Sequence, residues 1–331
     1  MTDGQIPAHL PVREAQAQTA DLILQTLRKA PPPVREMTNH LAGAQGKGVR
    51  TLLLLHCAVG EEGLVPRDAV SAAAAIELFH LATLVHDDII DDSPLRRGIP
   101  TLHRVFGRKQ AVICGDYLLC LAASLVAPLH AGYADNKEYT DFFSDFSAVL
   151  GRVCLGELRQ FQNNRNLSLP VPGYLRIIAG KTAALFYLSA LAGAITAGHS
   201  RGEVARLAGF GRYLGMVFQI LDDCKDYEFS EKEARKAVGK DAAEGVVTLP
   251  LIYAMGKLPE LRELAKQALD DAAFSGRLAR AVCEAGGTSQ SRKLAARYAQ
   301  KAERLLSDFP EGKARPLLEL LNKSLQAANA Y

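Results

Sequence analysis

The sequence lacks the cysteine patterns that hold metal clusters or disulfide frameworks. Its six cysteines are scattered, with no CxxC pair and no histidine-interleaved spacing of the zinc-binding kind. Most of them lie in apolar surroundings, which indicates buried free thiols in a reducing compartment. The net charge of +3 over 331 residues is too small to indicate a nucleic-acid partner.

No membrane or export signal stands out. The first ten residues are polar and contain proline, without the basic flank and apolar core of a signal peptide. Residues 182–198 form the most apolar run, but this run is slightly short for a membrane span and is rich in Ala, Gly, Ser and Thr. We therefore expect a buried helix there, and a soluble protein located in the cytoplasm.

Strand-like alternation and fixed-period repeats are also missing. The hydrophobic share of 48% and the charged share of 23% are ordinary for a soluble globular protein. The predicted helices span residues 15–29, 46–59, 66–92, 104–129, 141–163, 174–198, 203–226, 248–256, 258–274, 276–284, 289–306 and 314–328. These patterns predict an all-α helical bundle with a cavity, formed by a single domain over residues 1–331 in which 1–33 are an N-terminal helix and linker.

The longest predicted helix, 66–92, is apolar nearly all round and ends in a cluster of four aspartates, Asp87, Asp88, Asp91 and Asp92. In a helix Asp87 and Asp91 lie one turn apart, with Asp88 three residues from Asp91. Like charges at this spacing repel, so the cluster needs solvent, arginines or a cation. Mg²⁺ fits, because it takes oxygen ligands and is held by one or two carboxylates plus phosphates. The alternative is a solvated acidic helix end.

A polar stripe leads along the same helix to this cluster. Its members, at spacings of three or four residues, are Glu77, His80, Thr83, Asp87 and Asp91. Because the rest of the helix is apolar, such a stripe needs polar partners or a water-filled cavity.

A second aspartate motif ends the predicted helix 203–226. Asp222, Asp223 and Asp226 repeat the spacing of the first motif, and Gln219 lies on the same face as Asp222 and Asp226. One DDxxD is a weak signal in any acidic protein, whereas two at the ends of buried helices are hard to attribute to chance. If the two helix ends face each other, up to six carboxylates surround one cavity and can hold more than one Mg²⁺.

Basic residues near these apolar helices are candidate anion ligands, although each alone could be surface charge. They are Lys47, Arg50, Arg96, Arg97, Lys181 and Lys236. Carboxylates, Mg²⁺ and arginine or lysine together are how proteins hold polyphosphates. No Gly-rich P-loop and no GxGxxG occurs, so a nucleotide is not implied. His86 and His103 have no evident serine or cysteine partner, so covalent catalysis is not indicated.

The sequence resembles the trans-prenyl diphosphate synthases, or polyprenyl synthetases, over about residues 46–325. The matching segments are Lys47-x-x-Arg50, Glu77-Leu78-Phe79-His80, DDIID followed by Arg96-Arg97-Gly98, Gly180-Lys181-Thr182, FQILDDCKD, and residues 241–252. The resemblance implies an isoprenoid-synthase-type helical bundle around a central cavity, and a homodimer. It also implies that an allylic diphosphate is joined head-to-tail to isopentenyl diphosphate, with at most peripheral membrane contact for product release.

The resemblance assigns roles by position. The implied ligands of about three Mg²⁺ ions, for which Mn²⁺ can substitute, are Asp87, Asp88, Asp91, Asp222, Asp223 and Asp226. The implied contacts of the allylic diphosphate are Arg96, Lys181, Gln219 and Lys236, and those of isopentenyl diphosphate are Lys47, Arg50, His80 and Arg97. Thr182 is expected to bind substrate as well. Catalysis is expected to depend chiefly on Asp87, Asp91, Asp222, Arg96 and Lys181.

Product length is expected to depend on the residues just before the first motif. Thr83 and Ala82, four and five positions before Asp87, are small, and Phe79 lies two turns before it. Family members with aromatic residues at the nearer positions stop at farnesyl or geranylgeranyl products. The resemblance therefore implies a medium to long product, from hexaprenyl to decaprenyl, with Phe79 as a lower floor of the tunnel.

Three segments depart from the family pattern. Thr51 stands where the family often has proline, Val246 stands where it has a lysine, and the tail 327–331 is not basic. The alternatives are a farnesyl- or geranylgeranyl-length synthase, a non-catalytic subunit of a heteromeric synthase, and a class I terpene cyclase. A fourth alternative is a metal-binding helical protein without activity.

Overall fold

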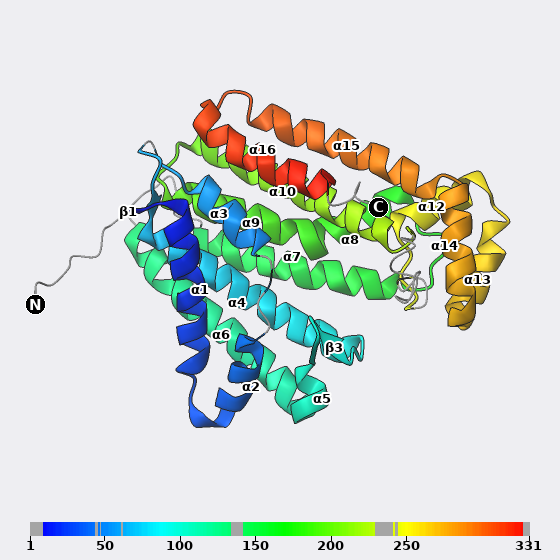
Figure 1. The fold of residues 1–331 in the computed structure, drawn as a ribbon, viewed down its shortest axis with the longest axis horizontal. Coiled ribbons are helices and arrows are strands. Elements are labelled where there is room, and N and C mark those ends of the chain that lie inside the picture. The colour runs from blue at the N-terminus through cyan, green and yellow to red at the C-terminus, as the bar shows by residue number, and fades with distance from the viewer. Residues whose placement is uncertain are drawn as a thin grey trace, which may run out of the picture. The chain divides into compact units, whose positions relative to one another are not determined.

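The computed structural model describes residues 9–43, 46, 48–60, 62–133, 142–228, 241 and 244–326, with the side chains of 130–133 and 142–145 outside this description. These residues are mostly helical, which confirms the predicted all-α class (Figure 1). The described strands have two residues each and form two antiparallel pairs: β1 (His9–Leu10) with β2 (Val65–Pro66), and β3 (Leu95–Arg96) with β4 (Ile99–Pro100).

The helices lie close to the predicted ranges. The described ones are α1 (Val12–Arg28), α2 (Pro32–Ala42), α3 (Val49–Cys57), α4 (Arg67–Ile90), α5 (Leu102–Phe106), α6 (Arg108–Tyr133), α7 (Phe142–Gln162), α8 (Val171–Ile178), the π-helix η1 (Ala179–Ala183), α9 (Ala184–Thr196), α10 (Arg201–Lys225), α12 (Leu249–Lys257), α13 (Leu261–Asp270), the 3₁₀-helix η3 (Ala272–Phe274), α14 (Ser275–Glu284), α15 (Gly287–Leu305) and α16 (Glu311–Gln326).

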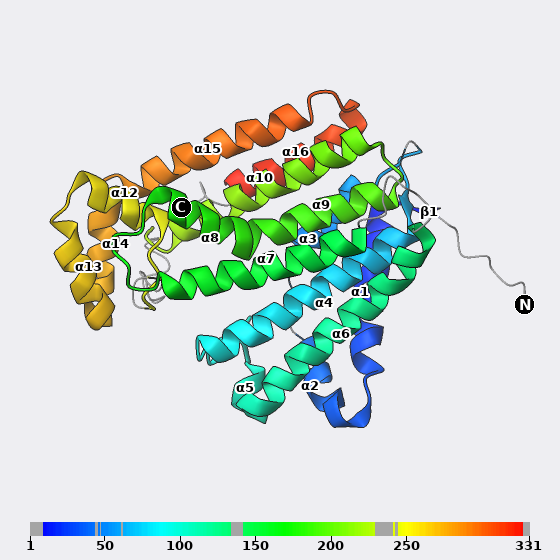
Figure 2. The same cartoon turned by 180° about the vertical axis from the view of Figure 1, so that it is seen from behind.

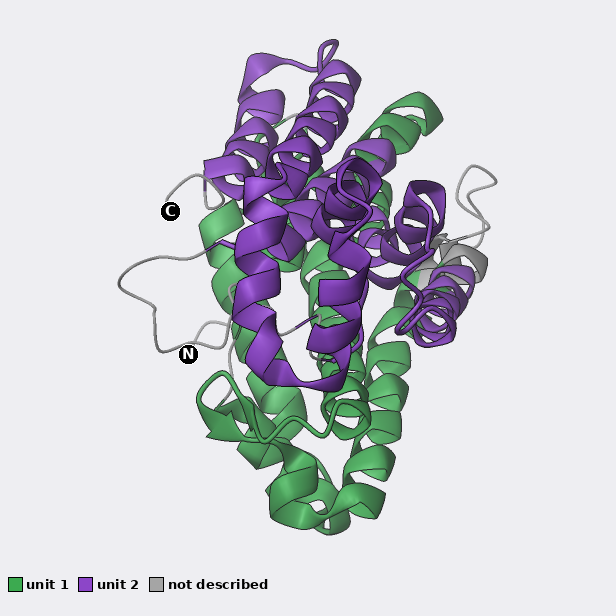
Figure 3. Ribbon diagram, turned by 90° about the vertical axis from the view of Figure 1, so that its right-hand side faces the viewer, with its two compact units in different colours: residues 1–146, 189–207 green, residues 147–188, 208–331 purple. Residues whose placement is uncertain are grey.

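The chain divides into two compact units, coloured in Figure 3. Unit 1 comprises residues Met1–Phe146 and Ser189–Leu207, and unit 2 comprises Ser147–Leu188 and Ala208–Tyr331. The division falls inside α7, α9 and α10, and the expectation of a single domain stays a prediction. Each unit is described below by itself.

Helix α4 is the core helix of unit 1. Pro66 precedes it in extended conformation, and its first half buries a run of alanines, 72–75, that favour helix and allow close packing. It contacts α1, α3 and α6, and Figures 1 and 2 show it beside α6. Gly115 of α6 lies against the ring of His86, where an added Cβ would be 2.4 Å from Nε2. The two helices therefore come close together next to Asp87.

Two helix boundaries in unit 1 differ from the prediction. The range predicted as one helix, 104–129, is broken at Gly107, whose φ of 89° ends α5 before α6 begins. The prolines after α1 do end that helix, but they do not form a linker, because Pro32 and Pro33 open α2. Proline is favoured in a first helical turn, where its missing N–H is not needed.

A π-helical turn interrupts the long helix of unit 2. The turn η1 follows α8 and holds the Gly180-Lys181-Thr182 motif, where we predicted uninterrupted helix. Glycines of both neighbouring helices touch it. A Cβ on Gly156 of α7 would lie 2.3 Å from the Lys181 backbone nitrogen, and one on Gly215 of α10 would lie 2.7 Å from the Ala183 Cα. Backbone contact on two sides thus fixes the position of η1.

Three helices are long and apolar enough to cross a membrane by length and composition: Arg67–Ile90, Arg108–Leu129 and Val171–Thr196. They differ in burial. The apolar windows of the first and third are 61% and 83% buried in the structure, whereas that of Arg108–Leu129 is only 33% buried. The predicted burial of the apolar run 182–198 agrees with this. Helix α6, in contrast, presents an apolar face that the described part of the chain leaves uncovered.

Candidate active site

The first aspartate motif lies where α4 ends. Asp91 is the C-terminal cap, its N–H donating to the Asp87 carbonyl, and Asp87 is half-buried one turn earlier. Asp88 differs from both, because it is only 5% exposed and accepts two hydrogen bonds on Oδ1 from Arg96, from Nε at 2.8 Å and from Nη2 at 2.6 Å. Asp87 and Asp91 therefore present carboxylates, while Asp88 anchors an arginine.

Asp92 does not belong to this cluster, contrary to the grouping of four expected from the sequence. It adopts a left-handed conformation with φ of 49°, and the Ser93 N–H donates to the Asp88 carbonyl, which is a Schellman end to α4. The turn directs Asp92 toward Arg104 and Arg108, at 2.8 and 2.7 Å. These arginines lower the Asp92 pKa, with the Arg108 hydrogen bond as the largest cause.

The next two predicted ligands lie in the β3–β4 hairpin: Arg96 ends β3, and Arg97 begins the two-residue turn that leads to β4. Arg97 and Gly98 both have positive φ, 53° and 84°, as the type I′ turn of such a hairpin requires. Arg96 and Arg97 therefore diverge. Arg96 returns to Asp88, whereas the Arg97 guanidinium lies against Gly46, where a Cβ would be 2.6 Å from Nη2.

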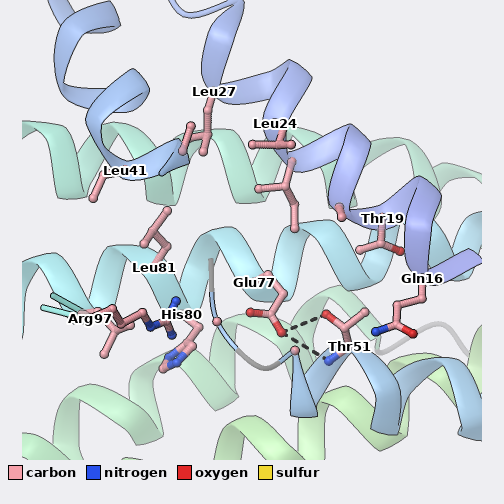
Figure 4. Close-up of a pocket in the computed structure, with 16 residues that line it drawn as sticks. Gln16, Thr19, Leu24, Leu27, Leu41, Thr51, Glu77, His80, Leu81 and Arg97 are labelled. Carbon is pink, nitrogen blue, oxygen red and sulfur yellow. Dashed lines mark hydrogen bonds between the residues drawn. The ribbon is translucent and has the colours of Figure 1, made fainter. Parts of the chain in front are cut away.

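A cavity of about 190 Å³ opens beside Arg97 in unit 1. One part of its wall is apolar, with Leu24, Leu27, Leu41 and Leu81 among its members; another part carries polar side chains. Figure 4 shows the leucines together and His80 beside Arg97. The cavity thus combines an apolar part with a polar part that carries Glu77, His80 and Arg97.

Arginine side chains surround His80. Burial lowers the pKa of His80 well below its ordinary value, and the charges of Arg50, Arg97 and Arg96 lower it further. Burial also lowers the pKa of Arg50 to about 10, opposed by Glu77 and assisted by Arg97. The structure therefore brings together Arg50, His80 and Arg97, three of the four residues predicted to hold isopentenyl diphosphate. The fourth, Lys47, lies outside the described residues.

Thr51, a departure from the family pattern, has a structural role here. Its Oγ1 donates to Glu77 Oε1 at 2.9 Å, and its backbone N–H donates to the same oxygen at 3.3 Å. Proline at this position could make neither bond, because it lacks both donors. Thr51 therefore fixes the carboxylate that offsets the positive charge of Arg50.

In unit 2 the second aspartate motif ends α10. Asp223 is 5% exposed, with Oδ2 accepting from the Tyr174 hydroxyl at 2.5 Å and Oδ1 accepting from Gln219 Nε2 at 2.7 Å. Asp222 is exposed and lies 3.5 Å from Lys225, and Asp226 is half-buried. The middle aspartate is again the buried one, held by protein donors, while the other two are more accessible.

Burial raises the pKa of Asp223 to about 7, although the hydrogen bonds from Tyr174 and Gln219 oppose this shift. The charges of Asp222 and Asp226 raise it further. Asp241 adds another acidic group: its N–H donates to Asp226 Oδ2 at 3.0 Å, and burial together with the neighbouring aspartates raises its pKa well above the ordinary value. Neighbouring carboxylates thus raise the pKa of both Asp223 and Asp241 here, as like charges do.

The remaining predicted residues of unit 2 lie on η1 and α10. Lys181 Nζ donates to Glu157 Oε1 at 2.9 Å, and Thr182 Oγ1 donates to Gln219 Oε1 at 2.6 Å. Both contacts place residues of the π turn against neighbouring helices. Lys236 lies outside the described residues.

The aspartates of the two motifs suit a metal ion that also binds the phosphates of a substrate. In the parts of the chain that the structure describes, no three His, Cys, Asp or Glu side chains form a group that could hold a metal ion by themselves. Two accessible carboxylates per motif suit Mg²⁺, which keeps several waters and binds through one or two carboxylates plus substrate phosphates. The idea that the two motifs face each other concerns residues of different units and stays a prediction.

The predicted chain-length residues are on α4. Phe79 and Ala82 are buried, and Thr83 is half-buried with its hydroxyl donating to the His80 carbonyl at 2.8 Å. The expected polar stripe of α4 is seen only in part in the burial pattern. Its members are half-buried or exposed, whereas Leu78, Phe79, Ala82 and Val85 are buried. Leu81 and Leu84, however, are half-buried like the polar residues.

Comparison with known proteins identifies the family. The sequence pattern of the polyprenyl synthetases matches residues 31–284, which is most of the chain. The chain belongs to the polyprenyl synthetase family. It is 35% identical to heptaprenyl diphosphate synthase component 2 of Geobacillus stearothermophilus, over 86% of this chain and 87% of that protein.

Solved structures of the family have the same fold. Heptaprenyl diphosphate synthase from Staphylococcus aureus matches with a TM-score of 0.86 and 29% identity, covering 96% of this chain and 98% of that one. A polyprenyl synthase from Caulobacter crescentus, complexed with calcium and isoprenyl diphosphate, matches with a TM-score of 0.83 and 30% identity, covering 95% and 96%. The protein is therefore a trans-prenyltransferase that elongates prenyl chains, in a family that uses isoprenyl diphosphates and generally depends on a divalent metal.

Several residues of this polyprenyl synthetase were not identified from its sequence. They are Tyr174, Glu157 and the contact glycines Gly156 and Gly215. A tyrosine and a glutamate in amphipathic helices carry no spacing signal. Glycines within a helix do carry one, because their cost of about 1 kcal/mol relative to alanine indicates a packing reason.

Proposed function

We propose that this polyprenyl synthetase is a Mg²⁺-dependent enzyme that joins isopentenyl diphosphate to an allylic diphosphate and makes a medium to long trans-polyprenyl diphosphate. The observation that carries the proposal is the cluster of Arg50, His80 and Arg97 beside a cavity, on the same unit and partly on the same helix as the first aspartate motif. An anion site beside carboxylates is the arrangement that a diphosphate and its metal need.

The cationic residues have separate roles in this proposal. Arg50, His80 and Arg97 hold the diphosphate of isopentenyl diphosphate, with Lys47 expected to join them. Arg96, Lys181, Thr182 and Gln219 contact the allylic diphosphate, as does Lys236 in the expectation from the sequence. Arg96 is oriented by Asp88, and Lys181 by Glu157. His80, neutral because of its lowered pKa, contributes a hydrogen bond rather than a charge.

The aspartates divide by accessibility in this proposal. Asp87, Asp91, Asp222 and Asp226 are the more accessible carboxylates and are the direct metal ligands. Asp88 and Asp223, predicted as further ligands, accept hydrogen bonds from protein donors. In this proposal they hold the ends of α4 and α10 in place, so that the neighbouring aspartates can bind the metal. When bound, Mg²⁺, expected at about three ions per site, stabilises charge on the departing diphosphate.

In this proposal, the steps after departure of the diphosphate need no acid or base from the protein. Loss of diphosphate leaves an allylic cation, the double bond of isopentenyl diphosphate attacks it, and a proton leaves. The proposed base is the released diphosphate. This agrees with the environment of His80, whose burial and neighbouring arginines disfavour a proton.

The experiment combines the purified chain, Mg²⁺, isopentenyl diphosphate and an allylic primer, and measures product length. We expect elongation that chelation stops and that Mg²⁺ or Mn²⁺ restores. Asp87→Ala should abolish turnover without unfolding the protein, because the change relieves repulsion and opens no core cavity. A chain that elongates no primer would refute the proposed activity.

Product length is the finer part of the proposal. Small residues at Ala82 and Thr83 leave space one turn before Asp87, and the relative component 2 from Geobacillus is named a heptaprenyl synthase. We expect products from hexaprenyl to decaprenyl, and Phe79→Ala should lengthen them. A product that stops at farnesyl would contradict the argument, and an unchanged length in the variant would remove Phe79 from the tunnel.

We also propose a homodimer, assembled through the uncovered face of α6. Ile113 is 65% exposed there, and Val112 is exposed beside it. Apolar patches of this kind are typical of contact surfaces. Ile113→Glu should shift the sedimentation coefficient of the purified chain to that of a monomer.

The alternative is a heteromeric synthase, as the name "component 2" indicates for the Geobacillus relative. Elongation by the purified chain alone would exclude an obligatory second component. A cytoplasmic location and a peripheral membrane contact for product release stay predictions.

A further inference from the structure

In unit 2, a series of hydrogen bonds connects Tyr174, which has no predicted role in binding, to three residues with proposed or predicted roles in binding. Thr182 Oγ1 donates to Gln219 Oε1, Gln219 Nε2 donates to Asp223 Oδ1, and the Tyr174 hydroxyl donates to Asp223 Oδ2, at 2.6, 2.7 and 2.5 Å. Tyr174 is buried and lies seven residues before Lys181. Its hydroxyl bonds Asp223, so we expect its effect on the neighbouring proposed ligands to pass through Asp223.

This series of hydrogen bonds begins and ends on the same helical segment. Tyr174 is on α8 and Thr182 is on η1, which follows it, whereas Gln219 and Asp223 lie one turn apart on α10. Residues at i and i+4 of a helix lie on one face. The segment from α8 to η1 therefore forms hydrogen bonds with one face of α10 at two positions.

The π turn makes this double contact possible. In an α-helix a separation of eight residues corresponds to about 800°, so Thr182 would lie about 80° away from the line of Tyr174. A π turn closes with an i→i+5 bond and holds one extra residue, which offsets about 100° and leaves the two residues within about 20° of one face. Both side chains can then face α10, with Lys181 between them.

We propose that Tyr174 is a positioning residue for the metal site, and that the chain from Tyr174 to Thr182 couples metal binding to diphosphate binding. This inference rests on the proposed function, in which Asp222 and Asp226 bind Mg²⁺ and Lys181, Thr182 and Gln219 bind the allylic diphosphate. Asp223 lies between the two proposed ligands, and both of its oxygens are directed at protein donors. Fixing Asp223 fixes the end of α10 that carries Asp222 and Asp226.

The test measures metal binding directly. Mg²⁺ is titrated by calorimetry into the full-length protein in the presence of inorganic diphosphate, for wild type, Tyr174→Phe and Tyr227→Phe. Tyr227 is the matched control, since it is also a buried tyrosine and lies just after α10, the helix that carries Asp223, but its hydroxyl bonds Thr248 Oγ1, at 2.8 Å, instead of a carboxylate. Circular dichroism confirms that each variant is folded.

We expect Tyr174→Phe to raise the Mg²⁺ concentration for half-saturation by about 10- to 100-fold, the usual effect of removing a hydrogen-bond partner behind a metal ligand. Tyr227→Phe should stay within about twofold of wild type, and the KM for isopentenyl diphosphate should change little in both. Equal Mg²⁺ binding by Tyr174→Phe and wild type would overturn the inference while leaving the proposed function intact. A wild-type protein that binds no Mg²⁺ with diphosphate would instead contradict the proposed function.

Thr182→Val provides a second route, should Tyr174→Phe be poorly folded. It removes the hydroxyl at the other end of the chain without touching Asp223. If the chain couples the two sites, Thr182→Val should also weaken Mg²⁺ binding, and the double variant should show less than the sum of the two effects. Strictly additive effects, or an unchanged Mg²⁺ affinity in Thr182→Val, would refute the coupling.

Discussion

Gly156→Ala tests whether close backbone packing holds the π turn in place. An added Cβ would lie 2.3 Å from the Lys181 backbone nitrogen and 2.7 Å from the Gly180 carbonyl carbon. Ordinary contact begins near 3.4 Å. Helix α7 and η1 would therefore have to separate by roughly 1 Å, and no side-chain rotation could avoid this, because the obstructing atoms are backbone.

The cost follows from two opposing effects. Overpacking of this kind destabilises by about 1–3 kcal/mol, whereas replacing glycine by alanine within a helix gains about 1 kcal/mol. We expect a net loss near the upper limit, about 2 kcal/mol in the free energy of unfolding, since rigid backbone cannot yield. If η1 moves by the full distance, kcat should fall by about 10²-fold, as misplacement by 1 Å commonly causes.

Gly151→Ala is the matched control. Gly151 lies on the same helix, five residues earlier, but an added Cβ there meets nothing within 4 Å. This variant should gain about 0.4–1 kcal/mol and keep its activity. Urea unfolding and kcat at saturating substrate compare the two variants. If Gly156→Ala were as stable and as active as Gly151→Ala, the packing argument for η1 would be wrong.

Two further predictions concern unit 1. Thr51→Pro should lower the free energy of unfolding by about 2 kcal/mol, measured in urea, because Glu77 loses both hydrogen bonds; Thr51→Ser should not, since it keeps both donors. The pKa of His80 is lowered in the folded protein, so below its ordinary value of 6.5 the unfolded chain binds a proton that the folded chain does not. Stability should therefore fall as pH drops from about 7.5 to about 5.5, and His80→Gln should reduce that fall. An unchanged slope in this variant would contradict the burial of a neutral imidazole.

Most of the fold could be predicted from the sequence, because long apolar periodicities decide where helices form. Helix α4 was expected over 66–92 and spans Arg67–Ile90, and α10 was expected over 203–226 and spans Arg201–Lys225. The differences occur where local backbone geometry decides. Gly107 breaks a predicted helix because it adopts positive φ, and η1 depends on contacts with other helices, which periodicity does not record.

The site could be predicted only as a set of residue types. Spacing places Asp87, Asp88 and Asp91 on one helix end, but it predicts the same role for Asp88 as for its two neighbours. The structure shows Asp88 buried against Arg96, because the β3–β4 hairpin returns Arg96 to α4. Burial and pairing of this kind depend on tertiary contacts, so a motif alone does not show which of its aspartates is buried against a protein donor.

The π turn also determines how the chain can vary in length. One residue is held in excess between Tyr174 and Thr182, and both ends are fixed to α10. Deleting Ala179 would let the segment return to α-helical geometry with seven steps between its two ends, about 700°, so both ends would stay within about 20° of one face. The bonds to Asp223 and Gln219 should therefore survive that single deletion. A one-residue insertion, or a second deletion, would rotate one end by about 100° and break one of the two bonds. Between residues 174 and 182, length changes that leave this enzyme active should therefore be limited to loss of the extra residue of the π turn.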